Sequence, residues 1–235
     1  MSDAALSYEL DGAVALIRLD DGKANALSPQ RVAVLGDLVT RAEKEAAAVV
    51  IAGRDGMFCA GFDLATMREG GEATRALVTA GAELLARLYV SPIPTVAACT
   101  GHGLAAGALM LLACDVRVGA RGDFKLGLNE VAIGMPLPIF AVTFARERLS
   151  KRHLTRATIL AEIYDPEGAV DAGYLDQLTD PATVVDRATA EARRLAEMPT
   201  EALGATKRTA REAATRHILD TLADDMAGLT GPDPS

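Results

Sequence analysis

The chain has 235 residues, the length of one domain with at most a small appendage. Half of its residues are hydrophobic, and its formal net charge is −8 without a basic tract. This composition argues against nucleic acid and anionic membrane surfaces as partners. The first residues contain neither a basic stretch nor an apolar run, so we expect no signal peptide. The three cysteines lack the spacing of a metal site, so we expect no metal and interpret them as buried thiols of a reducing, cytoplasmic compartment: Cys59, Cys99 and Cys114.

The first half of the chain alternates between strand and helix signals. Hydrophobic and polar residues alternate on both sides of Asp11-Gly12, which is typical of a β-hairpin. Ser28-Pro29 supplies an N-cap and a first-turn proline for a helix that ends at about residue 45. The apolar runs 47–53 and 95–99 predict strands, and the helical periodicity of 72–90 predicts a helix between them.

One uncharged stretch, residues 88–114, is long enough to cross a bilayer. Pro92, Pro94 and the turn Gly101-His102-Gly103 interrupt it near its middle. We therefore predict a strand, a turn and a buried helix over 104–114 rather than a membrane span.

The second half predicts a strand followed mainly by helices. The strand covers 115–120, and helices are expected from Pro138 to about 149, over 150–161, and from 181 to about 228 with a break at Pro199. The pattern predicts an α/β protein with a core over 1–180 and a helical region over 181–235, whose tail is disordered from about residue 230. No glycine-rich loop with the spacing of a nucleotide-phosphate site follows a strand.

Two segments share one local pattern, in which a strand is followed by small residues and then by a helix: 49–67 and 95–118. Glycine and alanine allow another group to approach the backbone closely, and the first N–H groups of a helix are unpaired. Two such helix starts facing one point would stabilise a developing oxyanion. The alternative is that the small residues only permit tight packing of strand against helix.

Glu130 is the only charged residue between Lys125 and Arg146. A carboxylate in an apolar run costs free energy unless something compensates for it. Glu130 is therefore either a functional carboxylate or an exposed residue at a helix start after Asn129, stabilised by the helix dipole.

Four motifs in order, GKANALS (22–28), FCAGFDL (58–64), GHGLAAGALMLLACD (101–115) and GLNEVAIGMP (127–136), resemble the crotonase superfamily of enoyl-CoA hydratases and isomerases. The segment 165–178 also looks like a later motif of that family, so the resemblance runs from about residue 5 to about 210. It implies a crotonase-like spiral of β–β–α units with a C-terminal helical region that mediates trimer formation. A homotrimer or a dimer of trimers is expected. The implied ligand is an acyl-CoA thioester, and no separate cofactor is expected because coenzyme A is part of the substrate.

The resemblance also assigns roles to individual residues. It implies that the backbone N–H groups of Ala60 and Ala106 hold the thioester oxygen. It places Leu109 in the substrate site, where it replaces the first of two water-binding glutamates of the hydratases, whereas Glu130 matches the second. The CoA moiety is expected along the following residues: Lys23, Ala24, Ala26, Ala60, Phe62, Asp63 and Leu64.

One carboxylate opposite Leu109 is most similar to the mitochondrial type of Δ3,Δ2-enoyl-CoA isomerase. Moving a double bond needs one acid/base, whereas water addition uses two carboxylates. Two alternatives stay open: a hydratase with another water-activating residue, and a catalytically silent acyl-CoA-binding paralogue.

Four further residues have structural alternatives to a role at the ligand. Asp63 is expected to cap a helix, and Asp115 to be a structural hydrogen-bonding partner. His102 either reaches the ligand or has a structural role. Lys207 either lies near the CoA phosphates, as the resemblance implies, or belongs to a solvated helix face.

Overall fold

The structure is a computed structural model that describes residues 5–229. Its main sheet has the strand order β1-β2-β3-β5-β7-β9, in which β1 and β2 are antiparallel and the other neighbours are parallel. The strands are β1 (Leu6–Asp11), β2 (Val14–Leu19), β3 (Ala48–Ala52), β5 (Thr95–Cys99), β7 (Val116–Ala120) and β9 (Gln177–Thr179). This arrangement confirms the predicted α/β class.

The hairpin at Asp11-Gly12 is confirmed by the pairing of β1 with β2. Asp11 lies opposite Val14, and Gly12 has φ +60°, a backbone conformation that glycine adopts without strain. Strands β3 and β5 are buried along their whole length, as is typical of parallel strands covered on both faces.

A second, smaller sheet has the order β4-β6-β8 and was not predicted from the sequence. It consists of β4 (Gly56–Cys59), β6 (Gly101–Leu104) and β8 (Leu126–Gly127). A Cβ on Gly101 would lie 2.0 Å from the carbonyl carbon of Gly56, so the two strands can approach only because the position is glycine. In both strand–helix segments of the sequence, a short strand of this sheet therefore precedes the helix.

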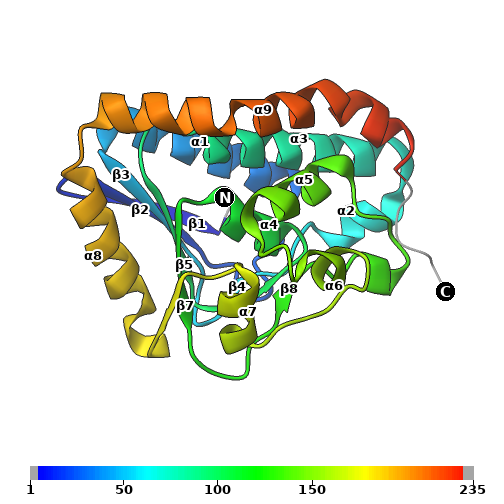
Figure 1. The fold of residues 1–235 in the computed structure, drawn as a ribbon, viewed down its shortest axis with the longest axis horizontal. Helices are drawn as coiled ribbons and strands as arrows, with labels where there is room; N and C mark the ends of the chain where they lie inside the picture. Colours follow the sequence, from blue (N-terminus) through cyan, green and yellow to red (C-terminus); the bar gives the residue numbers. More distant parts are fainter. Residues whose placement is uncertain (1–4, 230–235) are drawn as a thin grey trace.

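Helices cover both faces of the main sheet (Figure 1). The helix α8 (Val184–Ala196) packs on one face against β2, β3, β5 and β7. On the other side lie α1 (Pro29–Glu45) and α3 (Gly71–Tyr89), and α9 (Thr200–Ala227) runs along α3 and α5 (Ile139–Arg148). The remaining helices are α2 (Leu64–Glu69), α4 (Ala106–Ala113), α6 (Leu154–Thr158) and α7 (Pro166–Ala172), with the short 3₁₀ turns η1 (Val131–Ile133) and η2 (Pro181–Thr183).

Several predicted helices are confirmed and two are shorter than predicted. Ser28 caps α1 by accepting a hydrogen bond from the N–H of Arg31, and every residue of α4 is buried. The helix predicted over 104–114 begins only at Ala106, because Ala105 has φ +50°. The helix predicted over 150–161 is reduced to α6, because a turn closed by the His153 N–H and the Ser150 carbonyl precedes it.

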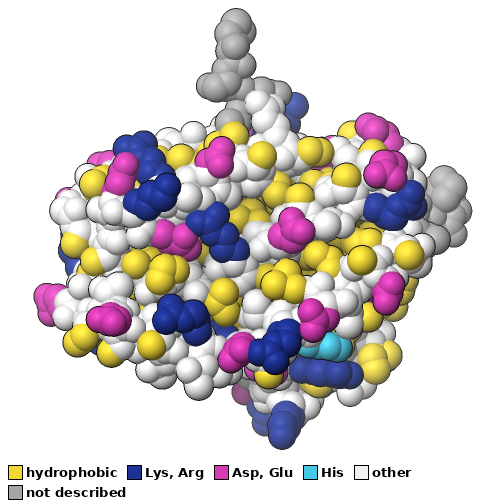
Figure 2. Space-filling model, turned by 90° about the horizontal axis from the view of Figure 1, so that it is seen from above, with side chains coloured by type: hydrophobic (Ala, Val, Ile, Leu, Met, Phe, Trp, Pro, Cys, Tyr) yellow, Lys and Arg dark blue, Asp and Glu magenta, His cyan; other side chains and the backbone are white. Residues whose placement is uncertain are grey.

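The surface of the protein carries charges of both signs (Figure 2). On the face viewed from the α9 side in Figure 2, acidic and basic side chains are interspersed, in agreement with the lack of a basic tract. Among residues 5–229, no helix has the length and apolar character that a membrane span requires. The tail predicted to be disordered from about residue 230 lies outside the described residues.

Candidate active site

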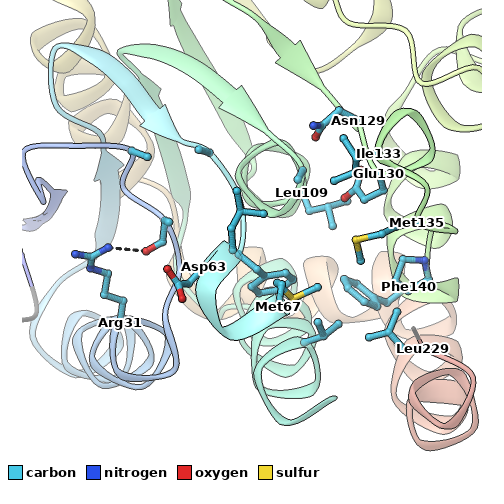
Figure 3. A pocket seen from close by; sticks show the side chains of 18 of the residues that line it. Arg31, Asp63, Met67, Leu109, Asn129, Glu130, Ile133, Met135, Phe140 and Leu229 are labelled. Carbon is cyan, nitrogen blue, oxygen red and sulfur yellow. Dashed lines mark hydrogen bonds between the residues drawn. The ribbon is translucent and has the colours of Figure 1, made fainter. Parts of the chain in front are cut away.

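A cavity of about 570 Å³ opens beside the second sheet and has chemically different ends. In Figure 3, Arg31 and Asp63 lie toward one end, and Phe140 and Leu229 lie at the other. The first end is polar, whereas the far end is apolar. A cavity of this kind fits an amphipathic ligand that has a polar portion and a hydrocarbon portion.

Glu130 projects its carboxyl group into this cavity (Figure 3). Its carbonyl accepts hydrogen bonds from the N–H groups of Ile133 (3.1 Å) and Met135 (2.9 Å), which fixes the turn around η1. Its Oε2 is buried and has no hydrogen-bond partner among residues 5–229. Burial raises the pKa of Glu130 to about 7, although a hydrogen bond from its own backbone N–H acts in the opposite direction. The alternative of an exposed helix-start residue is therefore wrong.

Leu109 of α4 lies beside Glu130 in the same cavity. Its N–H donates to the Ala105 carbonyl at 3.0 Å, and its side chain is 1% exposed. An aliphatic side chain at this place offers no hydrogen-bonding group to a water beside Glu130.

The other two acidic residues that line the cavity are already engaged. Asp21 forms an ion pair with Arg31 at 2.8 Å. Asp63 accepts hydrogen bonds from the N–H and the hydroxyl of Thr66, both at 2.9 Å, and so caps α2 as predicted. Glu130 is therefore the one lining carboxylate with a buried, unpartnered oxygen in the part of the chain that the structure describes.

The backbone amides of the loop before α2 differ in their availability. The N–H of Ala60 donates to the carbonyl of Ala24 at 3.0 Å, so this amide is occupied. Leu27 donates to the Gly61 carbonyl at 2.8 Å and accepts from the Asp63 N–H at 3.0 Å. The Phe62 N–H between these two bonds has no acceptor among the described residues. The amide available for a ligand in this loop is that of Phe62, and not that of Ala60 as the sequence motif indicated.

The second loop provides the amide of Ala106, the first residue of α4. Ala105 donates to the Gly127 carbonyl at 2.9 Å, whereas the Ala106 N–H has no acceptor within residues 5–229. A Cβ on Gly61, whose φ is +106°, would lie 2.8 Å from the Ala105 Cβ and 3.4 Å from the Ala106 nitrogen. The two loops therefore touch, and Gly61 permits the contact.

The structure brings nearly all predicted site residues together. Those that line the cavity are Lys23, Ala24, Ala26, Ala60, Phe62, Asp63, Leu64, Leu109 and Glu130. Ala106 is buried and follows the lining residue Ala105 in the chain. Further lining residues were not predicted. Ala105, Asn129, Ile133 and Met135 lie inside the recognised motifs but were given no role there, and the others come from segments outside these motifs: Asp21, Arg31, Met67, Val78, Pro138, Phe140 and Leu229.

Three residues for which the sequence allowed a structural role do not line the cavity: His102, Asp115 and Lys207. The Nδ1 of His102 accepts a hydrogen bond from the Lys125 N–H at 2.9 Å, which is a structural role. Lys207 is 8% exposed, and its Nζ lies 2.6 Å from Asp115 Oδ2, so the expectation of a solvated helix face is wrong. Lys207 is not among the residues that line the cavity. Asp115 also accepts from the N–H of Thr95 at 2.8 Å, which confirms its structural role.

The three cysteines are all residues of the core. All three cysteines are free and buried, and burial raises the pKa of each thiol to about 12. Between residues 5 and 229, no cluster of His, Cys, Asp and Glu is arranged to hold a metal ion.

The comparison with known proteins identifies the family. The model of the enoyl-CoA hydratase/isomerase family matches residues 9–229. The chain belongs to this family. A probable enoyl-CoA hydratase of Bacillus subtilis is 32% identical over 209 residues, which cover 85% of this chain and 79% of the relative.

Solved structures agree with the family assignment and with the expected crotonase fold. An enoyl-CoA hydratase/isomerase family protein from Pseudomonas syringae superimposes with a TM-score of 0.93 at 36% identity, covering 96% of this chain and 98% of the other. Human mitochondrial delta3-delta2-enoyl-CoA isomerase superimposes with a TM-score of 0.90 at 27% identity, covering 95% of this chain and 89% of the other. The protein is therefore a crotonase-fold enzyme of acyl-CoA thioesters.

Proposed function

We propose that this family member is a Δ3,Δ2-enoyl-CoA isomerase that moves a double bond from C3 to C2 of its substrate. The observation that carries the proposal is the pairing of one unpartnered carboxylate, Glu130, with the aliphatic Leu109 in an apolar part of the cavity. One acid/base suffices for a double-bond shift.

The reaction transfers one proton between two carbons through Glu130. Its carboxylate removes a proton from C2, next to the thioester carbonyl, and the electron pair of the C–H bond passes to the thioester oxygen as an enolate. When the enolate collapses, C4 takes the proton from the Glu130 carboxyl and the double bond forms between C2 and C3. Burial supports this role, because a pKa of about 7 lets Glu130 both accept and return a proton near neutral pH.

The enolate oxygen is held by the N–H groups of Phe62 and Ala106 in this proposal. Both amides lack an acceptor in the described part of the chain and belong to loops in contact at Gly61. Each such donor contributes about 3–4 kcal/mol to the stabilisation of a transition state. Phe62 takes the place that the sequence motif had assigned to Ala60.

The CoA portion occupies the polar end of the cavity in this proposal. Lys23 and Arg31 provide positive charge there, and Ala24 and Ala26 leave the backbone accessible to an extended chain. The Nε of Arg31 is buried without a partner, although its Nη1 bonds to Asp21 and to the Ala26 carbonyl. A phosphate or an amide carbonyl of the ligand would complete these contacts.

Hydration of 2-enoyl-CoA is the second candidate, and one observation favours it. The Oδ1 of Asn129 lines the same cavity and is buried without a partner, as is Glu130 Oε2. Buried acceptors without a donor are suitable partners for an ordered water. The relative from Bacillus subtilis is also named a probable hydratase.

Incubation of the pure protein with 3-hexenoyl-CoA tests the proposal, with the absorbance of the conjugated 2-enoyl product as the readout. We expect turnover by the wild type, none by Glu130→Gln, and unchanged turnover by Glu72→Gln, whose side chain is 93% exposed on α3. Faster formation of 3-hydroxyacyl-CoA from 2-enoyl-CoA would establish the hydratase. Acyl-CoA binding without either reaction would identify a silent paralogue.

The quaternary structure is a separate part of the proposal. We propose a homotrimer or a dimer of trimers, on the strength of the family membership alone. Light scattering coupled to size-exclusion chromatography distinguishes the trimer, the hexamer and the monomer.

A further inference from the structure

The apolar end of the cavity is closed by side chains from four different helices or their ends. Met67 comes from α2, Val78 from α3 and Phe140 from α5, whereas Leu229 follows α9. In Figure 3, Phe140 and Leu229 lie on the side of the cavity opposite Arg31, with Met67 between the two sides and Glu130 above Phe140. A hydrocarbon chain that extends past Glu130 therefore meets Leu229.

Leu229 is held in place by the last turn of α9. Its N–H donates to the Met226 carbonyl at 3.2 Å, and Met226 itself is 4% exposed in the core. Leu229 packs partly buried against the same core. The chain thus presents the Leu229 side chain to the cavity from a fixed helix end rather than from a free loop.

Asp225 connects this helix end to the opposite cavity wall. Its Oδ2 accepts a hydrogen bond from the Ile139 N–H, the first amide of α5, at 2.7 Å. The N-cap residue of α5 is Pro138, which has no side-chain acceptor, so Asp225 of α9 performs the capping instead. Pro138 and Phe140, on either side of Ile139, both line the cavity. One carboxylate therefore fixes Leu229 relative to the wall that faces it.

We propose that Leu229 sets the longest acyl chain that the cavity accepts, with Asp225 as the residue that positions it. The inference rests on the proposed function in placing the acyl group at the apolar end. A chain that is too long by one methylene must displace Leu229 or leave the cavity, and discrimination by one methylene in an apolar pocket is about 10–200-fold.

The test measures the Kd of saturated acyl-CoAs from butanoyl-CoA to hexadecanoyl-CoA by isothermal titration calorimetry. For the wild type we expect affinity to rise with chain length and then fall at a cut-off. In Leu229→Ala the cut-off moves to longer chains, and the first excluded chain binds at least about tenfold more tightly. In Leu229→Phe the cut-off moves to shorter chains.

Three further variants separate positioning from general stability. Leu219→Ala removes an exposed leucine of the same helix and should keep the wild-type cut-off. Asp225→Ala should broaden the cut-off, and Asp225→Asn, which retains an acceptor oxygen, should restore it. The inference is overturned if both Leu229 variants keep the wild-type cut-off, or if they change the affinity for every chain, including butanoyl-CoA, by the same factor.

Saturated ligands keep this test independent of catalysis. If 3-hexenoyl-CoA is not isomerised but the cut-off moves as expected, the proposed function fails and the chain-length role of Leu229 stands. If isomerisation occurs and the cut-off does not move, only the role of Leu229 fails.

Discussion

The Nζ of Lys207 in α9 lies 2.6 Å from Oδ2 of Asp115, at the start of β7. Lys207 also donates to the Ile93 carbonyl at 2.9 Å, and Arg211 pairs with the other carboxylate oxygen of Asp115 at 2.8 Å. Burial lowers the pKa of Lys207, and Asp115 opposes this shift. This ion-pair cluster joins the C-terminal helix to the edge of the core.

Removal of the Lys207 charge should destabilise the fold. We expect Lys207→Met to lower the free energy of unfolding by about 3 kcal/mol, because it leaves a partly buried carboxylate with fewer partners. Arg208→Met, at the exposed neighbouring position, should change it by no more than about 0.5 kcal/mol. Urea unfolding followed by circular dichroism provides both values, and equal midpoints for the two variants would contradict the structural role.

The pH dependence of isomerisation should report the raised pKa of Glu130. Only the carboxylate form can remove the C2 proton, so kcat/KM should fall about tenfold per pH unit below a pKa of about 7. A profile of kcat/KM for 3-hexenoyl-CoA, from about pH 5 to about pH 9, locates the acidic limb, the pH range in which kcat/KM falls. A limb near the ordinary carboxyl pKa of 4.5 would contradict the burial of the charged group.

The same pKa shift makes Glu130 a cost to stability at higher pH. The folded pKa is raised from 4.5 to about 7, so the penalty is absent below 4.5, grows between the two values and is complete above about 7. Glu130→Gln should therefore stabilise the fold by up to about 3 kcal/mol above pH 7 and have no effect below 4.5. Thermal unfolding across this pH range measures the difference in stability between Glu130→Gln and the wild type. Glu72→Gln is the control, and its effect on stability should not depend on pH.

The contact between the two amide loops should be sensitive to one methyl group. Gly61→Ala would place a Cβ 2.8 Å from the Ala105 Cβ and push apart the amides of Phe62 and Ala106. We expect kcat to fall about 10²–10³-fold, the loss of one oxyanion donor. Gly56 also has a positive φ, but a Cβ at this position would meet no atom within 4 Å. Gly56→Ala therefore measures the effect of backbone strain without a clash. Similar kcat values for the two folded variants would contradict the oxyanion role.

A second carboxylate opposite Glu130 should introduce water addition. We expect Leu109→Glu to form 3-hydroxyacyl-CoA from 2-enoyl-CoA and to isomerise more slowly, because two carboxylates can hold and activate one water. Leu109→Gln has nearly the same size without the charge and should not gain this activity. Liquid chromatography of the CoA products compares the two variants, and equal hydration by both would refute the argument.

The sequence by itself determined the elements that depend on neighbouring residues. The Asp11-Gly12 hairpin, the Ser28 cap of α1 and the fully buried α4 follow from turn chemistry, capping and periodicity, which act over a few positions. The short strands of the second sheet escaped prediction, because segments of two to four residues rich in glycine carry too little periodicity. The motifs also located Glu130 and Leu109, although not the direction of the Glu130 side chain.

Only the tertiary structure decided which groups are buried, occupied or in contact. Lys207 looks solvated in a charged helix, but packing of α9 on the core buries it against Asp115. The amide of Ala60 is occupied by the Ala24 carbonyl and that of Phe62 is not, a competition between hydrogen bonds that no local pattern records. Leu229 lines the cavity, and Asp225, four residues before it, caps a helix that begins 86 residues earlier in the chain. Such contacts depend on how distant segments pack, since burial and hydrogen-bond partners are properties of the whole fold rather than of a sequence window.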